Sequence, residues 1–153
     1  MQVISNHRTI RNNFEKVVDK VKEKDLISVP KGFNNHILWN IGHVVATQNV
    51  LIYGMSGLDF TLPTDFIKRY KKGSFPTQID NPKTELQTIF ELGKIADEQL
   101  SYDIKEMIFD NYQKYETSFG VVLNSFNDAL QFNNIHEAVH LGYVMAIKRA
   151  LGY

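Results

Sequence analysis

Residues 125–151 read SFNDALQFNNIHEAVHLGYVMAIKRAL, a long stretch without proline. Ser125 and Asp128 resemble a capping box, a pattern that marks the start of a helix. At 100° per residue, one stripe about 80° wide contains Ala129, Phe132, His136, His140, Tyr143 and Ile147. The stretch therefore predicts a long helix that carries two histidines on a largely apolar face.

Three further amphipathic helices are predicted upstream, at about residues 5–24, 34–54 and 80–102. In each of them apolar residues recur at three- and four-residue spacing. Asn34 or Asn35 can cap the second helix, and Gly54 can end it. The third helix starts at Asn81-Pro82, where a capping residue precedes a proline at the first helical position.

The segment between the second and third helices, residues 55–80, is interrupted by glycine and proline, so only a short helical turn after Pro63 is expected there. Its length of some 25 residues lets the chain recross the molecule, in which case the second and third helices run parallel. No run of alternating strand residues is convincing. The fold class predicted is all-α: a four-helix bundle with a long crossover between helices 2 and 3, forming a single domain over residues 1–153.

The overall composition is that of an ordinary globular protein. The 153 residues are 43% hydrophobic and 22% charged, far from the signature of disorder. Seventeen basic residues balance seventeen acidic ones, so no net field attracts nucleic acid. We expect no nucleic-acid partner.

The chain contains no cysteine, which removes disulfides, thiolate ligands and a cysteine nucleophile together. No stretch approaches the roughly 20 apolar residues of a membrane span, and no secretory signal is recognisable. A cytoplasmic protein without membrane contact is expected. Any bound metal must use nitrogen and oxygen ligands.

The histidines are the candidate ligands. His136 and His140 are four residues apart on a helix, so both imidazoles can reach one ion. On its own such a pair is more often two core or partly exposed histidines than a metal site. His43 is the best third ligand, because an unpartnered polar ring among apolar residues would be costly if buried.

Other polar residues are assigned to the surface. His36 lies seven residues before His43 on nearly the same face; a polar pocket wall and a solvated face both fit, and the solvated face is preferred. His7 and the basic cluster 68–72 look like solvated surface. Glu137 points about 100° away from its neighbour His136, which favours a surface or supporting role over metal ligation.

Two segments together resemble the DinB-like superfamily of metal-binding four-helix bundles. They are Trp39-Asn40-Ile41-Gly42-His43 and His136-Glu137-Ala138-Val139-His140-Leu141-Gly142, followed by Lys148-Arg149-Ala150-Leu151-Gly152. The resemblance spans nearly the whole chain.

The resemblance implies that His43, His136 and His140 match the family's metal triad. Zinc and nickel are favoured as the divalent ion, with iron and manganese as alternatives. It also implies the long crossover, a homodimer paired through helix faces, and a small-molecule substrate such as a low-molecular-weight thiol of the bacillithiol or mycothiol type. Many relatives carry a glutamine where this chain has Tyr143, so substrate assignments do not transfer directly.

The function predicted is a metal-dependent transferase or hydrolase. Three neutral imidazoles leave the ion its charge and an open position, the arrangement of a catalytic site, where a thiol or water is activated. The alternative is a non-catalytic metal-binding or dimerisation bundle. A third reading is a packing domain whose histidines bind no metal. No nucleotide fingerprint, serine triad or paired-carboxylate motif is convincing.

Overall fold

The computed structural model describes residues 2–76 and 78–153. Within them the chain forms six α-helices, one 3-10 helix and a two-stranded antiparallel sheet. In chain order the elements are α1 (Gln2–Val18), α2 (Glu23–Leu26), α3 (Ile37–Ile52), η1 (Gly54–Ser56), α4 (Thr64–Tyr70), α5 (Pro82–Lys105), β1 (Tyr115–Glu116), β2 (Val122–Leu123) and α6 (Phe126–Ala150). The fold is all-α, as the sequence predicts.

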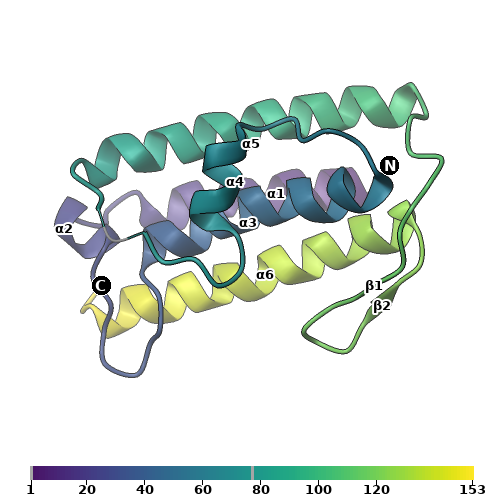
Figure 1. Cartoon of the computed structure of the whole chain (residues 1–153). Coiled ribbons are helices and arrows are strands. Elements are labelled where there is room, and N and C mark those ends of the chain that lie inside the picture. The colour runs from purple at the N-terminus through teal and green to yellow at the C-terminus, as the bar shows by residue number, and fades with distance from the viewer. Residues whose placement is uncertain (1, 77) are drawn as a thin grey trace.

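The long helices α1, α3, α5 and α6 lie side by side, and α4 crosses them on one face (Figure 1). Val45 lies beside Gly93, and Gln48 donates a hydrogen bond to Asp97. Because both pairs advance along α3 and α5 together, these two helices run in the same direction. Helices α1 and α6 run the opposite way (Figure 1).

The start of α6 is the capping motif that the sequence indicates. The hydroxyl of Ser125 accepts a hydrogen bond from the Asp128 amide, and the Asp128 carboxylate accepts one from the Asn124 amide. One of the free donors of the helix start is thereby satisfied, together with the amide that precedes the cap. At α5, Pro82 is the first helical residue as predicted, although the side chain of Asn81 makes no capping bond.

Two other helix boundaries differ from the prediction. The first predicted helix is divided, since α1 ends at Val18 and α2 begins at Glu23. The second is capped by His36 instead of an asparagine, because Nδ1 of His36 accepts a hydrogen bond from the Trp39 amide at 2.9 Å. The predicted short helix after Pro63 is α4.

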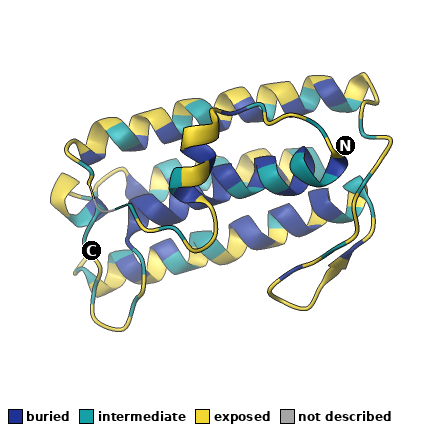
Figure 2. Ribbon diagram, in the orientation of Figure 1, coloured by how far each residue is buried: buried dark blue, intermediate teal, exposed yellow. Residues whose placement is uncertain are grey.

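Helix α3 occupies the centre of the fold. Every one of its residues except Thr47 and Val50 is buried, whereas α5 and α6 keep exposed faces (Figure 2). A central helix has no solvated side, so each polar side chain on it needs a partner inside the protein. This environment forces the polar residues of α3 into the contacts that build the site described below.

Helix α4 packs closely on α3 at Gly42. A Cβ atom at this position would overlap the ring of Tyr70, so only glycine admits the ring. The contact holds the C-terminal end of α4 beside His43. Among residues 2–76 and 78–153, no helix has both the length and the apolar character needed to cross a bilayer.

Candidate metal centre

The structure brings His43 of α3 together with His136 and His140 of α6. Each residue has a ligand nitrogen that lies within 4.8 Å of the corresponding nitrogens of the other two. The ring centroids are 4.6 Å apart for His136 and His140, and 4.9 and 5.2 Å from His43 to His140 and His136. The three residues singled out from the sequence therefore form one cluster.

Asn40 orients the ring of His140. Its Nδ2 donates to the His36 carbonyl at 2.8 Å, which turns its Oδ1 toward His140 Nδ1, also at 2.8 Å. The proton of His140 therefore sits on Nδ1, and the lone pair of Nε2 is left free. A histidine held in this way by an outer hydrogen bond is typical of metal ligands.

His43 is held by the backbone of α4. Its Nδ1 donates to the Tyr70 carbonyl at 2.8 Å, so Nε2 carries no proton. The ring stacks on Trp39, with centroids 4.5 Å apart and planes 9° from parallel. The hydroxyl of Thr47 lies 3.3 Å from Nε2. Stacking and hydrogen bond together fix the ring.

His136 completes the cluster with an unsatisfied atom. Its Nδ1 is buried and has no hydrogen-bond partner among the residues that the structure describes. A buried polar atom without a partner costs free energy, unless an ion or another group binds there. Two oriented imidazoles and one unsatisfied imidazole are a nitrogen donor set that fits a divalent ion.

The protonation equilibria of the cluster favour neutral rings. Burial, followed by repulsion from the neighbouring histidines, lowers the pKa of His140 to about 3. Burial, followed by the charge of His43, lowers the pKa of His136 to about 4. Burial also lowers the pKa of His43, and Lys72 adds to this effect. Neutral imidazoles are the form that binds metal ions, so the site is ready at neutral pH.

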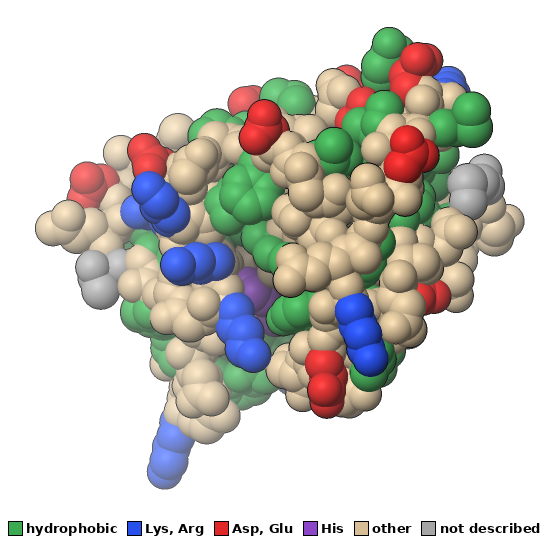
Figure 3. Space-filling view, turned by 45° about the vertical axis from the view of Figure 1, so that its right-hand side comes forward, with side chains coloured by type: hydrophobic (Ala, Val, Ile, Leu, Met, Phe, Trp, Pro, Cys, Tyr) green, Lys and Arg blue, Asp and Glu red, His purple; other side chains and the backbone are tan. Residues whose placement is uncertain are grey.

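The triad opens into a cavity of about 520 Å³, the size of many small-molecule sites. Its walls come from α3, α4, the β1–β2 hairpin, the loop at Phe60 and α6. In Figure 3 histidine is visible at the bottom of a hollow, with basic side chains beside the opening. A ligand can therefore reach the cluster from solvent.

Three residues that the sequence analysis placed elsewhere are corrected by the structure. His36 is 2% exposed, not solvated, because it caps α3. His7 is fully buried rather than at the surface, since its Nε2 donates to Asp97 at 2.7 Å. Tyr143 packs edge-on against Phe33 and does not line the cavity.

Glu137 is fully buried, so of the two roles predicted for it the surface position is excluded and the supporting role is left. Arg11 of α1 binds both of its oxygens, and Asn133 donates to it at 2.9 Å. Gln48 of α3 accepts from Arg11 at 2.9 Å. This ion pair ties α1, α3 and α6 together directly behind His136. The pair could not be predicted from the sequence, because Arg11 and Glu137 are 126 residues apart in the chain.

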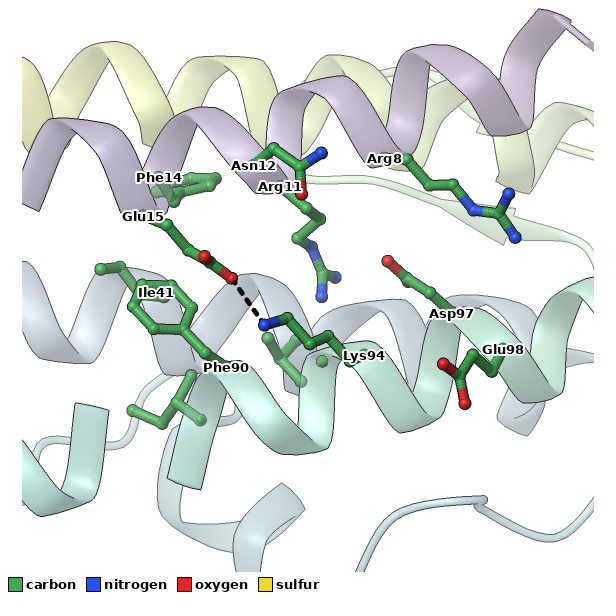
Figure 4. A pocket seen from close by; sticks show the side chains of 13 residues that line it. Arg8, Arg11, Asn12, Phe14, Glu15, Ile41, Phe90, Lys94, Asp97 and Glu98 are labelled. Atoms are coloured by element: carbon green, nitrogen blue, oxygen red, sulfur yellow. Dashed lines mark ion pairs between the residues drawn. The ribbon is translucent and has the colours of Figure 1, made fainter. Parts of the chain in front are cut away.

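A second cavity, of about 240 Å³, lies between α1 and α5 (Figure 4). Arg11 and Asp97 line it, and the exposed pair of Lys94 and Glu15 spans its side at 3.4 Å. Its lining, as far as the structure describes the chain, includes no histidine. The larger cavity over the triad is therefore the stronger candidate for chemistry.

Comparison with known protein families gives a match over most of the chain. Residues 7–144 fit the family model described as the DinB superfamily, which covers well over half of the chain and all three clustered histidines. No curated protein sequence matches the chain.

Proposed function

The chain belongs to the DinB superfamily, and on that premise we propose that it is a metal-dependent enzyme that acts on a small molecule. His43, His136 and His140 bind one divalent ion, with zinc and nickel favoured by the all-nitrogen donor set. The observation that carries the proposal is the orientation of the triad. Two of its rings are held by outer hydrogen bonds, and all three face a cavity that a substrate can enter.

A divalent ion on neutral imidazoles supplies, when bound, a Lewis acid that lowers the pKa of a thiol or water. The residues of the chain do the positioning. Asn40 and the Tyr70 carbonyl keep two ring protons away from the ion. Trp39 shields one side of His43 from solvent by stacking on it.

The cavity lining favours a thiol over water as the activated group. Within the described part of the chain, no aspartate or glutamate lines the cavity, so no carboxylate base is available there. An ordinary thiol has a pKa of about 8.5, whereas bulk water has one of about 15.7. A thiol therefore needs far less help to lose its proton, which supports transfer of a low-molecular-weight thiol to an electrophile.

The finer features of the assembly belong to the same proposal. We infer that residues 1–153 form one domain and that the segment between α3 and α5 is the long crossover of a four-helix bundle. We also infer a homodimer. Its support is the exposure of three apolar side chains on the outer side of α6, those of Ile135, Val139 and Met145, since exposed apolar surface commonly pairs with a second copy.

The test combines metal content with turnover. Protein purified without a histidine tag is analysed for metals, then assayed with bacillithiol, mycothiol and simpler thiols against an electrophile such as monobromobimane. We expect about one ion per chain and metal-dependent transfer, both lost in His140→Ala while circular dichroism is unchanged. Turnover that persists in this variant contradicts the proposal. A fall in melting temperature with chelator, without any turnover, indicates the non-catalytic alternative.

A further inference from the structure

Three lysines line the cavity over the triad. Lys68 lies on α4, and Lys71 and Lys72 directly follow this helix, so all three approach from one side. From this arrangement we propose that the cavity selects amphipathic anions: molecules with an apolar body and a carboxylate or phosphate group that the lysines hold. The inference deepens the proposed function and rests on it for the reaction, but the lysine contact itself needs no metal.

The charge of the lysines is largely uncompensated. Lys68 lies 3.8 Å from Asp65, with both side chains mostly exposed, so the pair is weak. Within residues 2–76 and 78–153, Lys71 and Lys72 form no ion pair, and no acidic residue lines the cavity. The field of the site thus favours an anion.

Much of the remaining cavity lining is apolar. The aromatic rings of Phe60, Phe119 and Phe132 line it, together with Val50 and Leu51. A small inorganic anion would leave this surface in contact with water, whereas an acyl or aryl body covers it. The volume of about 520 Å³ holds such a body together with its anionic group.

The experiment uses 4-phenylbutyrate, its neutral analogue 4-phenylbutan-1-ol, and 2-phenylethyl phosphate, each titrated into metal-free protein by calorimetry. The lysine variant is Lys68→Gln, Lys71→Gln and Lys72→Gln together. The matched control replaces the exposed Lys20, Lys24 and Lys31 by glutamine, which changes the net charge equally, away from the cavity. A second variant, Phe119→Ala, tests the apolar wall at a half-exposed position that does not endanger folding.

We expect the lysine variant to bind the acid about fivefold more weakly, with binding of the alcohol unchanged. The control variant keeps the wild-type affinity, and Phe119→Ala weakens both probes. The ratio between the carboxylate and the phosphate shows which anion the site prefers. Three outcomes overturn the inference. The wild-type protein binds the acid and the alcohol equally, it binds no probe, or the lysine variant and the control variant lose affinity equally. Because the titrations need no metal, a protein that binds no ion refutes the proposed function alone.

Discussion

Asn40 Oδ1 accepts a hydrogen bond from His140 Nδ1 across the interface of α3 and α6. The Asn40 amide is itself held by the His36 carbonyl, so the acceptor faces His140 in a fixed orientation. The hydrogen bond to His140, a candidate metal ligand, explains why an asparagine occupies this buried position on α3. The contact decides which nitrogen of His140 is free for an ion.

The first prediction concerns this contact. Asn40→Leu keeps the branched shape of the side chain but leaves the His140 Nδ1 proton without an acceptor. Loss of such an outer hydrogen bond typically weakens metal affinity 10- to 100-fold, and we expect a loss of about that size. Competition with a chromogenic chelator measures it. The control is Asn12→Leu, at an exposed position on α1. Equal metal affinity in the two variants would show that Asn40 does not orient His140.

The second prediction is a pH dependence of the metal-free protein. In the unfolded chain histidine titrates near 6.5, whereas in the fold the pKa of His136 is about 4 and that of His140 about 3. Between these values the unfolded state binds more protons, so the free energy of unfolding falls as the pH is lowered from about 7 to 4. Above pH 7 this contribution is fully present.

Urea denaturation of the metal-free protein at several pH values between 7.5 and 4.5 measures this dependence. The double variant His136→Gln, His140→Gln removes both groups, so its stability should fall less steeply over the same range. Between pH 7.5 and 4.5 the wild-type protein should lose more unfolding free energy than the double variant, by on the order of a few kcal/mol. Parallel curves for the two proteins would show that these histidines are not held neutral by the fold.

The third prediction concerns the ion pair behind the triad. Arg11→Met leaves the Glu137 carboxylate fully buried without its cation, which typically costs about 3–5 kcal/mol of stability. Lys94→Met breaks the exposed pair with Glu15, which should cost about 0–1 kcal/mol. Chemical denaturation compares the two variants. Similar small losses in both would mean that the Arg11 pair contributes no more than a surface contact.

The local rules of helix formation explain how much of this arrangement was predictable. The capping box at Ser125, Pro82 at the start of α5 and the four-residue spacing of His136 and His140 depend on neighbours in the chain, and the structure has all three. The burial of His36 and Glu137 could not be predicted, because it depends on the central position of α3 and on Arg11. Such partners come from remote segments, which periodicity cannot identify.

The last prediction separates two helical glycines that look alike in the sequence. A side chain at Gly42 would overlap the Tyr70 ring, whereas a Cβ at Gly142 meets no atom within 4 Å. Alanine improves helix propensity at either position by roughly 0.5–1 kcal/mol. Gly142→Ala should therefore be neutral or stabilising, and Gly42→Ala should destabilise by about 1–3 kcal/mol, because overpacking outweighs propensity. Since displaced α4 carries the Tyr70 carbonyl that holds His43, Gly42→Ala should also weaken metal binding. A Gly42→Ala protein with wild-type stability and affinity would show that α4 can shift without disturbing the site.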